Sequence, residues 1–201
     1  MRMRRLASLA ILMPSLVAGC THQLPPRGES DHADVRAAIE AQYAHIAAAM
    51  LRRDVEALVA TQDSAYRAVN PAIGQAFGYA EMSDYMRRQV GAIDSVISLR
   101  NTIRAFTVRG AARDTAIADV CQEFSRMQRV GDGGPRRVDT SVLQRETWVR
   151  RPTGWRRLEV SDVHGMRWFV EGVRVEPGRP YTPGMPAFRP DPDPPTACGL
   201  R

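Results

Sequence analysis

The stretch TSVLQRETWVRRPTGWRRLEVSDV, residues 140–163, contains two runs of β-favouring residues on either side of a predicted turn. The runs cover residues 142–150 and 155–163, and Arg-Pro-Thr-Gly occupies residues 151–154. Proline cannot donate to a strand ladder, and glycine tolerates a positive φ angle, so residues 151–154 predict a short turn. The two runs are therefore expected to pair as antiparallel strands.

Side chains alternate between the two faces of a strand, which fixes the neighbours of Trp148. Glu146 and Arg150 share its face, whereas Thr147 and Val149 take the other one. A hairpin of this length needs a covering layer, and the predicted helices all precede it in the chain.

Composition places the chain among ordinary globular proteins of about one domain. It has 201 residues, of which 44% are hydrophobic and 25% charged. All 28 basic residues are arginine, and without residues 1–19 there remain 25 arginines against 22 acids, a net charge of +3. This charge is too small and too dispersed to predict a nucleic-acid partner.

The N-terminal residues predict export and a lipid anchor. Residues 1–5 are basic and residues 6–18 are apolar, which is typical of a signal peptide and too short for a membrane-spanning helix. Residues 16–20, Leu-Val-Ala-Gly-Cys, resemble a bacterial lipobox, so residues 1–19 are the expected signal peptide and Cys20 the expected site of lipidation, including palmitate. An ordinary secretory signal is the alternative. Thr21 after the cysteine suggests an outer-membrane lipoprotein that faces the periplasm.

Three helices are predicted after a polar, proline-containing tether over residues 20–32. The first, to about Arg53, has apolar residues at spacings of three and four. The second begins after Asp54 and continues through Gln62 and Tyr66 until Asn70-Pro71. After a loop over residues 72–78, the third covers residues 79–93.

The remainder of the domain is rich in strand signals. Strands are predicted over residues 96–99, 102–109 and 115–127, before the hairpin, with a loop over residues 129–139 and a final strand within residues 166–175. Helices followed by strands indicate an α+β domain, residues 33–176, in which helices cover one face of an antiparallel sheet. The expected tail, residues 177–201, is rich in proline.

The order of these elements, with Arg-Asp-Val-Glu-Ala-Leu at residues 53–58 and Gly-Trp-Arg-Arg-Leu at residues 154–158, resembles the nuclear-transport-factor-2-like superfamily. The SnoaL-like and ketosteroid-isomerase-like branches are the most similar. The resemblance implies a cone-shaped, cystatin-like domain with an internal pocket, and a homodimer formed through the sheet. It also implies five pocket-lining candidates, with core packing as the alternative role: Tyr43, Tyr66, Tyr85, Met86 and Trp148.

The sequence does not match the complete set of catalytic residues of these relatives. Tyr43 matches a helical tyrosine of the isomerases, but Asp63 falls on the wrong side of its predicted helix. Asp119 is either a hydrogen-bond donor acid or an exposed strand residue. Ser161 stands where many relatives place a histidine, and His164 comes three residues later. No catalytic residue is therefore assigned.

Metal and cofactor sites are not predicted either. The four histidines lack metal-ligand spacing, and the glycine-rich segment 131–134 lacks further acids for calcium. The expected function is non-catalytic binding of an apolar small molecule or a protein partner at the cell envelope. The alternatives are an enzyme that transfers protons on an apolar substrate and a structural protein with a filled cone.

Two cysteines remain after Cys20, namely Cys121 and Cys198. An even pair in an exported protein predicts a disulfide, which would tie the tail to the predicted strand 115–127. The alternative is a buried Cys121 with a Cys198 that is free or pairs between chains.

Overall fold

The computed structural model describes residues 32–70, 75–131, 133–176, 179–189 and 198. The predicted signal peptide and most of the predicted tether therefore lie outside the described residues. The domain contains helices α1 (Ala33–Arg52), α2 (Val55–Val59) and α3 (Tyr79–Ala92). Its strands are β1 (Gln62–Asn70), β2 (Gln75–Gly78), β3 (Ile93–Arg109), β4 (Thr115–Arg129), β5 (Pro135–Arg151), β6 (Gly154–Val170) and β7 (Val173–Val175). None of the helices in these ranges is long and apolar enough to span a membrane.

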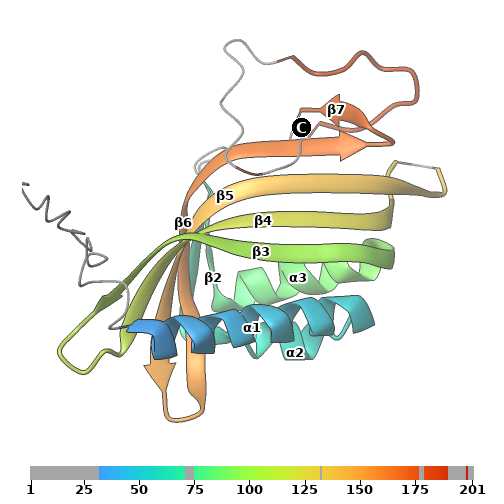
Figure 1. Cartoon of the computed structure of the whole chain (residues 1–201). Coiled ribbons are helices and arrows are strands. Elements are labelled where there is room, and N and C mark those ends of the chain that lie inside the picture. Colours follow the sequence, from blue (N-terminus) through green and yellow to red (C-terminus); the bar gives the residue numbers. More distant parts are fainter. Residues whose placement is uncertain (1–31, 71–74, 132, 177–178, 190–197, 199–201) are drawn as a thin grey trace, which may run out of the picture. The chain divides into compact units, whose positions relative to one another are not determined.

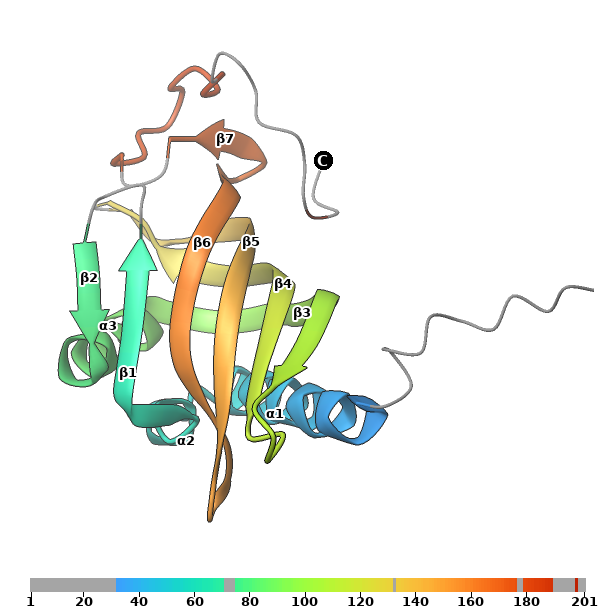
Figure 2. The same cartoon turned by 90° about the vertical axis from the view of Figure 1, so that its left-hand side faces the viewer.

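The strands form one curved, open sheet in the order β2-β1-β6-β5-β4-β3, and β7 pairs with β6. Helices α1 and α3 lie under the concave side of the long strands (Figures 1 and 2). The predicted α+β class is confirmed. The sheet is mixed, because β1 runs parallel to β6 whereas the other pairs are antiparallel, so the prediction of a purely antiparallel sheet was wrong.

The first helix has the apolar stripe that its sequence predicts. It ends where Arg53 adopts a left-handed conformation with φ 55°. The backbone N–H of Arg53 donates to the carbonyls of Ala49 and Met50 in the last turn. The buried residues follow the helical spacing, and they pack against the inward side chains of β4 and β5: Val35, Ile39, Tyr43, Ile46 and Ala49.

The second helix was predicted too long. The side chain of Asp54 accepts the N–H of Ala57 at 3.1 Å, as expected of a cap, but the helix ends at Val59 and strand β1 follows. Gln62 and Tyr66 are four residues apart, a spacing that fits one face of a helix and also one face of a strand. Pairing with β2 and β6 on either side holds this segment as a strand.

The hairpin of the opening stretch is present and longer than predicted. Strands β5 and β6 pair antiparallel, and the turn closes at Arg151 opposite Gly154, which has a φ of 110°. The predicted loop 129–139 was too long, because β5 already begins at Pro135. Residues 166–170 continue β6, so only β7 is a separate final strand.

Two further predictions needed correction. The separate strands 96–99 and 102–109 form the continuous strand β3. Residues 75–78, predicted as a loop, form strand β2, while residues 71–74 lie outside the described part. The third helix was predicted correctly to within one residue at its C-terminal end.

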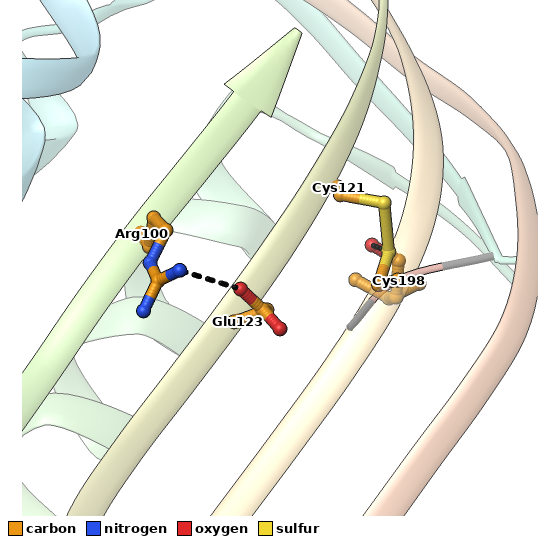
Figure 3. Close-up of a disulfide and its surroundings, with 5 residues drawn as sticks. Arg100, Cys121, Glu123 and Cys198 are labelled. Carbon is orange, nitrogen blue, oxygen red and sulfur yellow. Dashed lines mark hydrogen bonds and ion pairs between the residues drawn. A yellow bond between two sulfur atoms is a disulfide. The ribbon is translucent and has the colours of Figure 1, made fainter. Parts of the chain in front are cut away.

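The described parts of the tail contact the far end of the sheet. Tyr181 and Met185 pack against a cluster of valines, and the backbone N–H of Phe188 donates to the carbonyl of Arg174 at 2.8 Å. Further on, Cys198 forms a disulfide with Cys121, with Cα atoms 5.5 Å apart (Figure 3).

Candidate functional site: an apolar cavity with a polar sheet wall

A cavity of about 370 Å³ lies between the helices and the concave face of the sheet. This volume is within the lower part of the range for small-molecule sites. The wall formed by α1 and α3 is mainly apolar and includes Ile46, Met50, Met82 and Val90. Such a wall suits the apolar body of a ligand.

The structure brings three of the five pocket candidates to this cavity and places two elsewhere. Tyr66, Tyr85 and Met86 line its wall. Tyr43 and Trp148 lie in the core between α1 and the sheet, with ring centroids 5.4 Å apart and planes nearly perpendicular. The alternative role of core packing therefore describes these two residues.

A buried carboxylate, Glu146, lies next to the cavity. Its side chain is completely inaccessible to solvent and accepts four hydrogen bonds. The Tyr43 hydroxyl donates at 2.7 Å and the Trp148 Nε1 at 3.0 Å, both to Oε2. The Gln144 amide donates at 2.7 Å and the Arg157 guanidinium at 3.1 Å, both to Oε1. Both carboxylate oxygens are thus engaged by donors of the protein.

The pKa values of the neighbouring groups follow from burial and from the charge of Glu146. Burial raises the pKa of Tyr43 well above its ordinary value of 10, and the Glu146 carboxylate adds to this effect. Burial opposes the charge of Arg157, but attraction to Glu146 dominates and raises the pKa of Arg157. Burial also raises the pKa of Tyr66. At neutral pH both tyrosines are therefore hydrogen-bond donors, and Arg157 is a cation.

The sheet contributes polar groups to the cavity wall, including Gln62, Gln144 and Arg157. Gln62 and Arg157 are directly opposite each other on β1 and β6. The Oε1 atom of Gln62 and the Nε atom of Arg157 are buried and have no hydrogen-bond partner within the described part of the chain.

The residues considered for catalysis lie away from the cavity. Asp63 is on β1 and forms an ion pair with Arg151 at 2.6 Å, whose hydrogen bond lowers the pKa of Asp63. Asp119 is ion-paired with Arg145 at 2.8 Å and does not line this cavity. Its strand position is on the face that points away from Val120 and the core.

The remaining candidates agree with this picture. Ser161 and His164 are on β6, and neither contributes to the cavity wall. His45, one of the four histidines, is exposed on α1 and lies off the apolar stripe of that helix. Among the described residues, no group of three or more histidine, cysteine or acidic side chains is arranged to hold a metal ion.

Sequence reasoning placed Glu146 on the face of Trp148 but gave it no role. The signal that could have found it was a carboxylate at an inward position of a central strand, where an unpaired charge is too costly to be accidental. Its partner Arg157 follows eleven positions later in the sequence, on β6, and could be placed beside it only with the register of β5 and β6.

Fold and cavity together define an α+β domain whose curved, open sheet encloses an apolar cavity against helices. Solved structures with this arrangement include a conserved protein from Planctomyces limnophilus, which is 16% identical with a TM-score of 0.52 and matches 66% of this chain and 97% of its own. The Kfla4162 protein from Kribbella flavida is 16% identical with a TM-score of 0.51, and the match covers 67% of this chain and 94% of that one.

A third similar structure, from Streptomyces avermitilis, carries a provisional dehydratase name within the NTF2-like family. It is 20% identical with a TM-score of 0.50, and the match covers 66% of this chain and 94% of its own. The domain has the nuclear-transport-factor-2-like fold, and the resemblance predicted from sequence is confirmed at this level. No protein-family model and no curated protein matches the sequence.

Proposed function

We propose that the domain binds an apolar small molecule in the cavity and does not transform it chemically. The observation that carries this proposal is the composition of the wall, which includes no aspartate, glutamate, histidine, cysteine, serine or threonine among its described residues. General acid–base catalysis needs a titratable group within hydrogen-bond reach of the reacting atom. The wall provides amides, arginines and tyrosines, and burial raises the pKa of Tyr66, so its hydroxyl stays protonated at neutral pH and serves as a hydrogen-bonding group.

Glu146 is the acid that a proton-transfer enzyme would need beside Tyr43, and its contacts argue against that role. Four donors occupy its two oxygens, and the carboxylate is fully buried outside the cavity wall. A general base needs a free lone pair directed at the substrate. Glu146 instead orients Arg157, whose guanidinium does line the cavity.

The proposal includes attachment to the cell envelope. A lipid on Cys20 would hold the domain at the outer membrane on the periplasmic side, and the polar segment 20–32 would act as a tether. The support is the basic and apolar leader followed by the lipobox-like residues 16–20. A homodimer through the sheet and a protein partner remain predictions of the same kind.

Native mass spectrometry of the full chain, purified from cells without added ligand, tests the binding function. A small molecule is expected to travel with the wild-type protein and to be lost in Ala68→Trp, because Ala68 lines the cavity and a tryptophan would fill it. Ile97→Trp is the matched control, since Ile97 is 49% exposed on β3 and does not line the cavity. Equal retention in both variants would contradict binding in this cavity.

A further inference from the structure

Arg126 is a buried cation in the cavity wall that forms no ion pair with a carboxylate among the residues that the structure describes. The residue is only 7% exposed. Its Nε donates to the amide oxygen of Gln128 at 2.6 Å and its Nη1 to the hydroxyl of Thr140 at 3.3 Å, and its guanidinium lies 4.5 Å from the ring centre of Phe124. All of these partners are neutral. Its Nη2 has no hydrogen-bond partner within the described residues.

The other arginine of the wall is different, because Glu146 already offsets the charge of Arg157 at 3.1 Å. Asp139 is the carboxylate with an electrostatic effect on Arg126, but its ion pair is with Arg137 at 3.0 Å. Burial lowers the pKa of Arg126 to about 10, which still leaves the guanidinium charged at neutral pH. The cavity wall therefore carries one positive charge that no ion pair within the described protein offsets.

A buried charge without a counter-charge is costly, and natural proteins usually provide it with an opposite charge. A guanidinium presents planar donors that match a carboxylate, and Nη2 of Arg126 is available for this contact. We infer that the ligand is an apolar anion of the carboxylate class whose charged group binds Arg126. This inference rests on the proposed binding function.

The wall also suggests how such a ligand lies. Gln122, Phe124 and Arg126 occupy alternate positions of β4, so their side chains follow one another along the concave face. The anion is therefore expected at the Arg126 end, with its apolar body against the methionines of α3.

Decanoate and decanol provide a direct test, because they share an alkyl chain and differ in charge at neutral pH. Isothermal titration calorimetry on the full chain should show decanoate binding at least about tenfold more tightly than decanol, as expected for one additional charge-assisted contact. Equal affinities would overturn the anion inference and leave the binding function intact. Binding of neither probe, together with no co-purified molecule, would count against both.

Variants of Arg126 test whether its charge causes the preference for decanoate. Arg126→Gln should weaken decanoate binding about tenfold or more and decanol binding much less, while Arg126→Lys, which keeps the charge, should retain the preference for decanoate. Arg100→Gln is the control, since Arg100 is on the other face of the sheet beside Glu123 (Figure 3). An unchanged decanoate affinity in a folded Arg126→Gln protein would overturn the assignment. If circular dichroism shows that this variant is unfolded, the assignment is tested instead by the decanoate affinity of Arg126→Lys and by the decanoate and decanol affinities of the wild type.

Discussion

Tyr43 donates its hydroxyl hydrogen to Glu146 at 2.7 Å, which connects helix α1 to strand β5 across 103 positions of the sequence. Both side chains are buried, so this contact is one of the hydrogen bonds that make a buried carboxylate tolerable in the core. Trp148 Nε1 contacts both partners, at 3.0 Å from Glu146 and 3.3 Å from the Tyr43 oxygen. The three side chains therefore act as one polar unit between the helix and the sheet.

Removing the hydroxyl in Tyr43→Phe should lower the free energy of unfolding by about 1–3 kcal/mol at neutral pH, because one donor to a buried carboxylate is lost. The effect should depend on pH. The pKa of Tyr43 is raised in the folded state by burial and by Glu146, so the stabilisation is complete below the unfolded-state value of 10 and declines as pH rises above it.

Urea unfolding of both proteins from neutral to alkaline pH checks this prediction. Above pH 10 the wild-type advantage should shrink by about 1.4 kcal/mol per pH unit, the linkage slope for one proton. Tyr79→Phe is a suitable control, because Tyr79 is an exposed tyrosine at the start of α3. A difference between wild type and Tyr43→Phe that stays constant across this range would show that Tyr43 titrates normally.

Trp148→Ala should be among the most destabilising changes in the domain. The indole is fully buried and packs against Tyr43, and truncation of such a side chain typically costs about 3–5 kcal/mol. Thermal melts of Trp148→Ala and Trp168→Ala make the comparison, since Trp168 is only partly buried at the end of the sheet. A larger loss for Trp168 would contradict the central position of Trp148.

The hairpin could be predicted from sequence because its signals are local. Pro152 and Gly154 restrict the turn, and alternation along the strand places Glu146 and Trp148 on one face without knowledge of any partner strand. The third helix was predictable for the same reason, since its apolar spacing lies within one segment.

Strand β1 could not be predicted in this way. Its segment has Gln62 and Tyr66 at a spacing that also fits a helix, and its strand state depends on pairing with β6, about ninety residues later. The position of Arg126 in the cavity wall could not be predicted either, because a charged residue on a predicted strand suggests an exposed position. Only the curvature of the sheet, which brings this residue over the cavity, reveals that it is buried.

Changing Cys20 to Ser should abolish lipid labelling and membrane association while the domain stays folded. The thiol is the acceptor for the predicted acyl chains, and serine keeps the size of the side chain without accepting them. Metabolic labelling with palmitate and fractionation of cell envelopes measure the outcome. Cys198→Ser is the matched control, because it also removes a cysteine but should leave labelling intact. A serine variant that still fractionates with membranes would contradict the lipoprotein prediction.

The disulfide between Cys121 and Cys198 should make the C-terminal segment part of the folded unit. Cys121 is on β4 with its side chain on the face opposite the inward Val120, and Cys198 is only 5% exposed there (Figure 3). The bond closes a loop across 77 positions, for which the chain-entropy model gives about 4 kcal/mol of stabilisation.

Peptide mapping of non-reduced, alkylated protein should recover one peptide that joins the two cysteines, and Cys198→Ser should lower the urea midpoint accordingly. Reductant should lower the wild-type midpoint to a similar extent and leave that of Cys198→Ser unchanged. If both thiols are alkylated without reductant, the segment is not covalently attached, and non-covalent contacts such as those of Tyr181, Met185 and Phe188 would have to hold it against the sheet.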